Sequence, residues 1–378
     1  MNIVHVITGL GIGGAELMLL RLSKQLRSKC SQVVVCLGEA GPIEHELKEA
    51  GISVEILNLN FSNFPFQVFR LWWIIRKYQP DLVQTWLYHA DLLGGIFAYL
   101  AGCRVVVWGI HNNDLSPDKM RWSTRLVSKI SAFISLYLPK KIICCSHSAV
   151  QTHVDYGYTA QKFHVIPNGF EVDLFFEDSS AKASVCNELG LNVSETRFIA
   201  CVARFDIQKN HQGFIDAASY FYRTYCYQDV HFLLIGKEMN FDNRKLFSWI
   251  ESAGLIDYMH LLDERNDIAR LMAACDIVSL ASWNEAFPNV LGEAMSCGAI
   301  AVSTDVGDAR LILGGQGFLV PVGDMLALAK AWQKVLDLND TERQLLKIQA
   351  KQHIRRSFEM SVVAEQYYSL YQSLAFNN

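Results

Sequence analysis

The sequence predicts an α/β protein made of two doubly wound domains, each a parallel sheet with helices on both faces. Its 378 residues, of which 51% are hydrophobic, are enough for two ordinary domains with a core each. Short apolar runs alternate along the chain with amphipathic stretches, which is typical of parallel strands joined by crossover helices. A Pro167-Asn168-Gly169 turn, followed by the small and acidic residues of 170–191, predicts the crossing between the domains.

The first strand is predicted at residues 2–8, directly before a glycine-rich turn and an amphipathic helix at residues 15–29. Leu19, Leu22 and Leu26 of that helix fall on one face. The apolar runs predict further strands of the first half at 32–37, 53–57, 82–86, 104–109, 141–145 and 164–166. In the second half they predict strands at 198–202, 231–236, 259–263, 277–281 and 299–303.

Composition narrows the class of protein. The formal net charge of -4 argues against a general nucleic-acid binder. The ten cysteines include no C-x-x-C pair and no histidine at metal-ligand spacing, so we expect no metal site and a reducing compartment. The chain starts with a strand-like MNIVHVI rather than a signal peptide, and no apolar run reaches about 18 residues. We therefore expect a cytoplasmic protein without a spanning helix.

Two stretches of the first half combine aromatic and basic residues. Basic residues outnumber acidic ones in residues 1–172, whereas the reverse holds beyond them. Basic and aromatic side chains on one amphipathic helix suit the anionic inner face of a membrane, which predicts peripheral contact there. The alternative is that the aromatic residues are core and the basic ones a solvated face. The stretches are 64–78, with Arg70, Arg76 and Lys77, and 121–141, with Arg125, Lys129, Lys140 and Lys141.

The most specific chemistry is expected in residues 281–298, which follow an apolar strand. Pro288 suits the first position of a helix, and an exposed helix N-terminus at the end of a parallel strand favours a phosphate. Glu285 and Glu293 flank that point, and eight helical residues span roughly 12 Å at about 1.5 Å each. The two acids could thus hold the hydroxyls at opposite ends of a sugar, diphosphate and ribose ligand. The alternative is a dipole-favouring acid and a solvated one.

The turn after the first strand supports a second interpretation. Gly9, Gly11 and Gly14 satisfy G-x-G-x-x-G between a strand and a helix, with Glu39 past the next strand as a candidate ribose acid. This pattern leaves a nicotinamide-dependent oxidoreductase open as an alternative.

Glu285-Ala286-Phe287-Pro288-Asn289, Glu293-Ala294-Met295 and Cys297-Gly298 resemble the E-x7-E segment of the retaining GT-B glycosyltransferases of family 4. The resemblance covers nearly the whole chain and is strongest to enzymes that build surface polysaccharides and O-antigens. It implies two Rossmann-like domains facing a central cleft. Residues 1–172, joined by a C-terminal helix within 360–378, would bind the acceptor, and residues 173–359 the nucleotide-sugar donor.

The resemblance also implies roles for residues of the first half. Gly13 and Gly14 match a loop that lies against donor phosphate and acceptor. The segments 85–94 and 107–112 match strand-end segments of the family, and His111 matches a histidine beside the transferred sugar. Without the family, His111 would be interpreted as a hydrogen-bonded structural residue, and His89 has a weaker claim.

In the second half, the resemblance assigns the donor site. Arg204 and Lys209 match the pair that neutralises the diphosphate, whose charge grows as the glycosidic bond breaks. Arg265 matches an arginine beside the nucleotide base, although Asp263 stands where a glycine is usual. Glu285 would grip sugar hydroxyls and Glu293 the ribose. The helix start adds donor contacts from Phe287, Pro288, Asn289 and Val290.

Together these observations and the resemblance predict metal-independent transfer of a sugar from a nucleotide sugar to a polyprenyl-linked or growing glycan. The resemblance alone implies retention of configuration, and a UDP-linked donor is expected. No cofactor is expected, because the cations and the helix start supply the positive potential. Two alternatives stay open: an NAD-dependent oxidoreductase that uses Gly9 to Gly14, and a GT-B sugar-nucleotide epimerase or binding module that leaves an acceptor unmodified.

Overall fold

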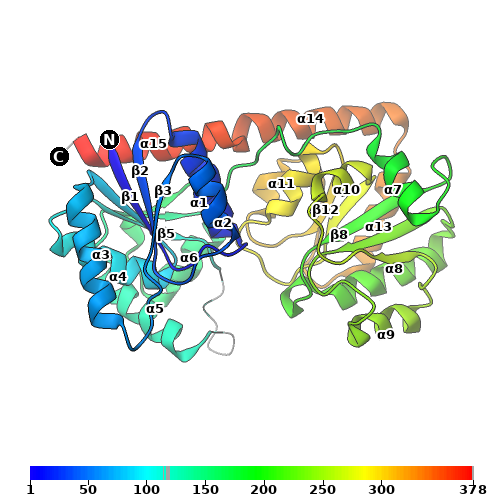
Figure 1. Ribbon diagram of the computed structural model, residues 1–378. Coiled ribbons are helices and arrows are strands. Elements are labelled where there is room, and N and C mark those ends of the chain that lie inside the picture. Colours follow the sequence, from blue (N-terminus) through cyan, green and yellow to red (C-terminus); the bar gives the residue numbers. More distant parts are fainter. Residues whose placement is uncertain (114, 116–119, 377–378) are drawn as a thin grey trace. The chain divides into compact units, whose positions relative to one another are not determined.

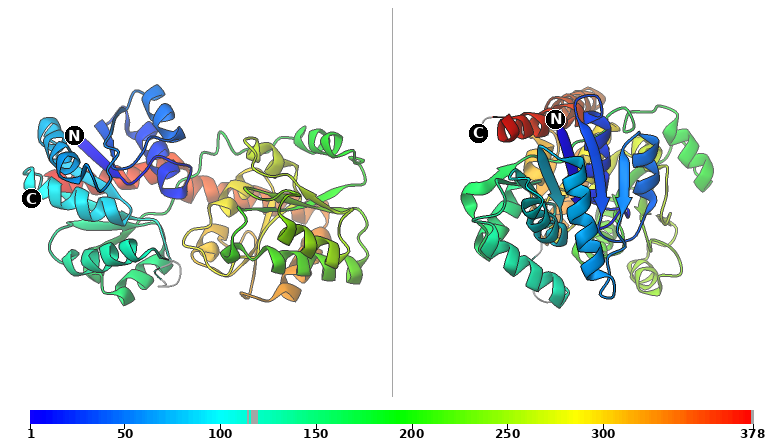
Figure 2. Two further views of the ribbon diagram at one scale, coloured as in Figure 1. Left: turned by 60° about the horizontal axis from the view of Figure 1, so that its bottom comes forward. Right: turned by 60° about the vertical axis from the view of Figure 1, so that its left-hand side comes forward.

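The computed structural model describes residues 1–113, 115 and 120–376. The chain divides into two compact units, which we call unit 1 (residues 1–169 and 360–378) and unit 2 (residues 170–359). Each unit is a parallel sheet with helices on both faces (Figures 1 and 2). The structure confirms the predicted fold class. No helix among the described residues is long and apolar enough to cross a bilayer.

Unit 1 has a seven-stranded sheet in the order β3-β2-β1-β4-β5-β6-β7. The order reverses between β1 and β4, so the loops after these strands flank a topological switch point. The strands are β1 (Asn2–Ile7), β2 (Ser31–Cys36), β3 (Ser53–Ile56), β4 (Leu82–Trp86), β5 (Val106–Ile110), β6 (Lys141–Cys144) and β7 (Phe163–Val165). The helices are α1 (Gly14–Leu26), α2 (Pro42–Glu49), α3 (Phe64–Tyr78), α4 (Tyr88–Leu100), α5 (Trp122–Ile134), α6 (His147–Tyr156), η1 (Ala160–Lys162) and α15 (Met360–Phe376).

The helices of unit 1 form two layers. The last helix, α15, packs against α1, whereas α3, α4 and α5 lie next to one another in chain order. The core between the sheet and the α1 layer is largely aliphatic, and it also contains Trp86 of β4 and Tyr367 and Tyr371 of α15. The C-terminal helix is therefore a structural part of the first sheet's core, although the whole of unit 2 separates the two in sequence.

Unit 2 has a six-stranded sheet in the order β10-β9-β8-β11-β12-β13, which reverses between β8 and β11. Its strands are β8 (Arg197–Val202), β9 (Val230–Ile235), β10 (Met259–Leu261), β11 (Ile277–Leu280), β12 (Ile300–Thr304) and β13 (Phe318–Val320). Its helices are α7 (Ala181–Leu189), η2 (Ile207–Lys209), α8 (His211–Tyr225), α9 (Arg244–Ala253), α10 (Ile268–Ala274), α11 (Asn289–Ser296), α12 (Ala309–Leu313), α13 (Met325–Leu336) and α14 (Asp340–Phe358).

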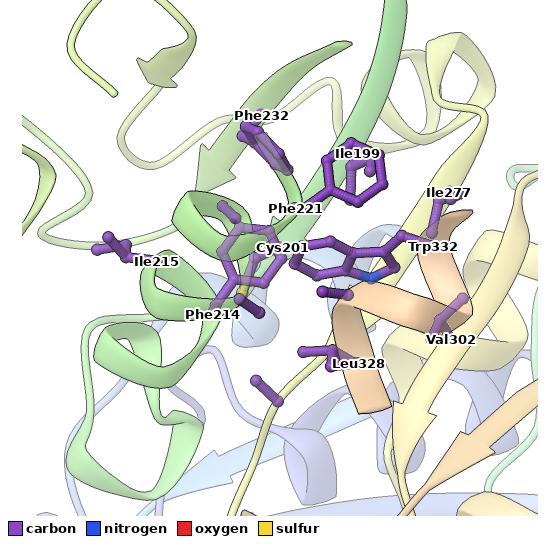
Figure 3. Packing of buried hydrophobic residues seen from close by; sticks show 14 of the residues in the cluster. Ile199, Cys201, Phe214, Ile215, Phe221, Phe232, Ile277, Val302, Leu328 and Trp332 are labelled. Atoms are coloured by element: carbon purple, nitrogen blue, oxygen red, sulfur yellow. The ribbon is translucent and has the colours of Figure 1, made fainter. Parts of the chain in front are cut away.

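Aromatic packing holds helices α8 and α13 on the second sheet. Trp332 of α13 lies 5.1 Å from Phe214 of α8, centroid to centroid, and close to Phe221 and Phe232 (Figure 3). The Trp332 indole N–H donates to Ser279 Oγ in β11 at 2.9 Å, so the buried donor is satisfied. This packing fixes β11, whose C-terminal end carries the loop of greatest interest.

Two local differences from the predictions have clear causes. Helix α11 begins at Asn289, and Pro288 is its N-cap rather than its first helical residue, because its ψ of 87° is not helical. The segment 170–191, predicted as a crossing, is largely built into unit 2. Phe170 is buried against Phe287 and Phe358, and α7 supplies core residues.

Candidate functional site

The loops that follow β8 and β11 meet at the switch point of unit 2. Lys209 Nζ lies 2.5 Å from Glu285 Oε1, and Ser282 Oγ donates to the same oxygen at 2.8 Å. Both charged side chains are mostly shielded from solvent. Two predicted site residues, 76 positions apart, thus form one ion pair at the carboxyl ends of neighbouring strands, where open α/β sheets bind ligands.

Backbone contacts tie these two loops together. The Asn210 side chain donates to Ala281 O at 3.2 Å, and the Trp283 amide donates to Gln208 O at 2.8 Å. Thr304 Oγ1 of β12 donates to Ser282 O at 2.8 Å. Because both loops are anchored on either side of the pair, the positions of the ammonium and the carboxylate are set before any ligand binds.

A glycine supports the loop from the other side. Gly307 has a φ of +52°, and a Cβ at this position would lie 2.4 Å from the carbonyl oxygens of both Glu285 and Ala286. The Asp308 amide donates to Ala286 O at 3.1 Å. Only a glycine allows this close approach of the two backbones, and no motif in the sequence marks Gly307 for this role.

The N-terminus of α11 follows the same loop. Its N-cap residue is Pro288, which has no side-chain group to accept a hydrogen bond from the first turn. A helix start of this kind, at a strand end, favours an anion. Asn289 and Val290 form its first turn, Glu293 follows half-buried in the helix, and Phe287 is buried against Phe170. Phe287 therefore anchors the loop.

Arg204 lies in the loop after β8 and is largely exposed, with its guanidinium 3.2 Å from Asp206. A residue that sequence analysis missed holds its backbone. His211 donates from Nε2 to Arg204 O at 2.9 Å and stacks on Phe205. Burial lowers the pKa of His211 to about 4, so the ring is neutral at neutral pH and its second nitrogen faces the Cys201 thiol.

Arg265 is engaged elsewhere in unit 2. Its guanidinium binds Glu188 at 2.7 Å and Asp267 at 2.9 Å, and Arg270 binds the same two carboxylates. Hydrogen bonds from the arginines hold the pKa of Asp267 well below its usual range. The cluster joins α7 to α10, so Arg265 has a structural function that its motif does not reveal.

Asp263, where the family usually has a glycine, has a φ of +50°. Aspartate is one of the few residues that tolerate this left-handed backbone. Its amide donates to Met239 O, its carbonyl accepts from Gly236 N, and its carboxylate accepts from Asn240 at 2.9 Å. The backbone conformation that glycine favours is thus kept at this position.

In unit 1, His111 follows β5 and stacks on Trp86, the last residue of β4, with centroids 5.1 Å apart and planes 18° apart. Burial lowers the pKa of His111 to about 4, and the nearby Asn168 side chain opposes this in part. A neutral imidazole at a strand end can exchange hydrogen bonds with hydroxyls but supplies no positive charge at neutral pH. His89 lies in α4, and burial lowers its pKa too.

Gly13 is the N-cap of α1, and Gly14 is its first residue. A Cβ on Gly13 would lie 2.5 Å from the Glu16 carboxylate, which is the far end of a flexible side chain and can move aside. Gly9 and Gly11 have open space around them and no positive φ. In a dinucleotide-binding turn, the first two glycines are required by a tight turn and by close approach of the backbone to the ligand. Neither Gly9 nor Gly11 shows a backbone conformation or a crowded contact that requires glycine.

Family models match both units of the chain. Residues 12–174 match the model "Glycosyltransferase Family 4", and residues 196–338 match "Glycosyl transferases group 1". The chain belongs to the family 4 glycosyltransferases. It is therefore a transferase enzyme of GT-B fold, and the nicotinamide-dependent alternative is set aside.

Two relatives and one solved structure each cover 89% or more of the chain. An Escherichia coli UDP-Gal:alpha-D-GlcNAc-diphosphoundecaprenol alpha-1,3-galactosyltransferase is 25% identical over 89% of this chain and 88% of its own. A Campylobacter jejuni N-acetylgalactosamine-N,N'-diacetylbacillosaminyl-diphospho-undecaprenol 4-alpha-N-acetylgalactosaminyltransferase is 25% identical over 91% of this chain and 92% of its own. The solved structure of Anabaena Alr3699/HepE in complex with UDP and glucose is 25% identical, has a TM-score of 0.84, and covers 99% of this chain and 100% of its own.

Proposed function

We propose that this family 4 glycosyltransferase moves a sugar from a UDP-sugar to a lipid-linked or growing glycan, with retention and without a metal. The observation that carries the proposal is the Lys209 and Glu285 pair, anchored at the carboxyl ends of β8 and β11 beside the proline-capped start of α11. It places a cation, a carboxylate and a helix N-terminus in one part of unit 2.

In this proposal, unit 2 binds the donor. Lys209, Arg204 and the α11 N-terminus face the diphosphate, where negative charge grows as the glycosidic bond breaks. Fixed positive groups stabilise the transition state more than the ground state. Glu285 accepts from sugar hydroxyls, and Lys209 keeps its ion pair with Glu285. Glu293, about one turn into α11, accepts from the ribose. The departing phosphate takes the acceptor proton.

Donor and acceptor classes are supported by the relatives. The Escherichia coli relative is named for UDP-Gal and a diphosphoundecaprenol acceptor, and the Anabaena structure holds UDP and glucose. Retention is supported by the family resemblance. Arg265 has less support as a base-binding residue, because Glu188 and Asp267 already bind its guanidinium.

The proposal is tested by incubating the purified protein with UDP- and GDP-sugars and a synthetic sugar-diphosphate lipid, with and without EDTA. We expect UDP release coupled to acceptor glycosylation with one UDP-sugar, unchanged by EDTA, and an anomeric proton of retained configuration by NMR. UDP-sugar binding without acceptor modification would favour the epimerase or binding module, and a GDP-sugar preference or EDTA sensitivity would contradict the donor or metal assignment.

We also propose that unit 1 contacts an anionic bilayer through α5. Trp122, Leu126, Ile130 and Phe133 recur at helical spacing and are all exposed, Trp122 and Phe133 by more than three quarters. Arg125 and Lys129 lie among them, and residues 120–154 contain no aspartate or glutamate. An apolar stripe bordered by cations is complementary to anionic lipid.

Helix α3 adds to the same argument. Its Leu71, Ile74 and Ile75 face the core, whereas Phe66 and Phe69 are exposed, so these two aromatic residues are not core residues. A vesicle sedimentation assay tests the surface. Trp122→Ser with Phe133→Ser should abolish binding to phosphatidylglycerol vesicles, while Phe241→Ser, an exposed phenylalanine of unit 2, should not. Equal binding by all variants, or a dimer that dissociates in the double variant, would contradict the proposal.

A further inference from the structure

A chain of buried contacts crosses the sheet of unit 1 and ends at His111. The Gln32 amide of β2 donates to Ser23 O of α1 at 3.0 Å, and its Oε1 lies 3.2 Å from His5 Nε2 in β1. The Trp86 indole N–H donates to His5 Nδ1 at 3.3 Å, and the indole stacks on His111. Residues of α1, β2, β1 and β4 thus support the imidazole ring of His111.

The hydrogen-bond partners of His5 determine which of its ring nitrogens carries the proton. The indole N–H of Trp86 can only donate, so His5 Nδ1 must accept. Gln32 uses its NH₂ group on Ser23 O, so its oxygen faces His5, whose Nε2 carries the proton. Burial lowers the pKa of His5 to about 4, which keeps this neutral tautomer at neutral pH. Since only one assignment satisfies every group, the indole has one preferred orientation.

The backbone after Trp86 is strained. Leu87 has a φ of +73° and a ψ of 155°, which is a costly conformation for leucine. Its amide donates to Gly109 O at 3.0 Å, and the buried Asp91 carboxylate accepts from Thr85 Oγ1 at 2.5 Å. The ends of β4 and β5 are therefore locked together beside the stacked rings. Strain of this kind clusters at functional sites.

The His111 ring differs from Gln32, His5 and Trp86 in its hydrogen bonding. Neither of its ring nitrogens forms a hydrogen bond of normal geometry with a residue that the structure describes. Its plane is set by stacking on Trp86, which in turn packs nearly parallel to Tyr367 of α15. Both nitrogens are buried, and apart from the nearby Asn168 side chain the described residues leave their hydrogen-bonding capacity unused.

We propose that Trp86 is the positioning residue of His111 in sugar transfer and that His5 sets the orientation of the Trp86 indole. This inference rests on the proposed function, because it assumes that His111 contacts the transferred sugar. Trp86 and His5 do not touch substrate. Their effect is to hold the imidazole in the one plane from which it can hydrogen-bond a hydroxyl.

Steady-state kinetics of Trp86→Leu, His111→Ala and the double variant test the coupling. We expect Trp86→Leu to lower kcat about as much as His111→Ala, on the order of 10²-fold, with no further loss in the double variant. His5→Gln, which can still accept from the indole, should keep most of the activity, and His5→Leu should lose about tenfold. Multiplicative losses in the double variant would overturn the proposal.

Trp108→Leu is the matched control. Trp108 is an equally buried tryptophan of β5 that packs edge-on against Tyr158. Its loss leaves a similar cavity, so it should lower the melting temperature comparably, and its effect on kcat should multiply with that of His111→Ala. Coupling of both tryptophans to His111 would indicate a general loss of packing and would contradict a specific role of Trp86.

A second readout does not depend on activity. NMR of ring-labelled histidine follows His111 directly, and in Trp86→Leu its pKa should rise from about 4 toward 6.5 as water reaches the ring. An unchanged titration in that variant would overturn the positioning role even if transfer is seen. If the titration shifts but no sugar is transferred by the parent protein, the proposed function fails while the structural coupling stands.

Discussion

The two units share an architecture but place opposite chemistry at their switch points. In unit 2, the loops after β8 and β11 bring Lys209 and Glu285 into an ion pair. In unit 1, the strands β4 and β5 bring Trp86 and a neutral His111 into a stack. The same parallel sheet thus supports a charged site suited to a diphosphate and a neutral, aromatic one suited to hydroxyls. The fold sets where a site lies, and local residues set what it can bind.

The largest effect is expected from the ion pair. Lys209→Met and Glu285→Gln should each lower kcat by about 10² to 10³-fold, because each removes a fixed group from the developing charge or the sugar. Lys209→Met should also weaken UDP binding by calorimetry. Lys351→Met, which breaks the pair with Glu177 in the same unit, is the control and should leave both unchanged. Full activity of both Lys209→Met and Glu285→Gln would contradict the proposed active site.

A smaller effect would separate the two units. His111→Asn should lower kcat by about 10²-fold while UDP affinity stays at the parent value, since the donor phosphates are assigned to unit 2. The measurement pairs initial rates with calorimetric titration of UDP. A comparable loss of UDP affinity in this variant and in Lys209→Met would contradict the assignment of donor binding to unit 2 alone.

The pH dependence of stability should reflect the buried histidines. His5, His111 and His153 of unit 1 have pKa values lowered to about 4 by burial, so their contribution is fully present above pH 6.5 and is lost as the pH falls toward 4. The buried Asp91 has a raised pKa and acts in the opposite direction. Urea unfolding at pH 7 and pH 5 should therefore show a smaller loss in His5→Gln than in the parent, and an equal loss would contradict the assignment.

The smallest effect is expected at Arg265. Its carboxylate partners are partly exposed, so Arg265→Lys should cost at most about 1 kcal/mol in unfolding free energy. UDP affinity should change less than threefold by calorimetry if the arginine is structural, as its contacts suggest. A tenfold or larger loss of UDP affinity would instead restore it as a base-binding residue.

Most strands were predicted within a residue or two, because buried parallel strands are continuous apolar runs bounded by turns. The first residue of α11 is harder to predict, because only the ψ of Pro288 shows that this residue caps the helix instead of beginning it. The roles of His211 and Gly307 were not predicted, since a single histidine after Asn210, or one glycine in a loop, carries no periodic signal. Arg265 matched its motif, but its partners come from α7 and from the loop before α10.

The α/β class, the succession of strands along the chain and the E-x7-E segment can be predicted from local periodicity and spacing. Which of those residues meet depends on the folded sheets. Lys209 and Glu285 are 76 residues apart, and Trp86 reaches His5 across 81. Such contacts follow from the strand order β1-β4-β5 and β8-β11, which depends on how the whole sheet packs and cannot be found in any short stretch.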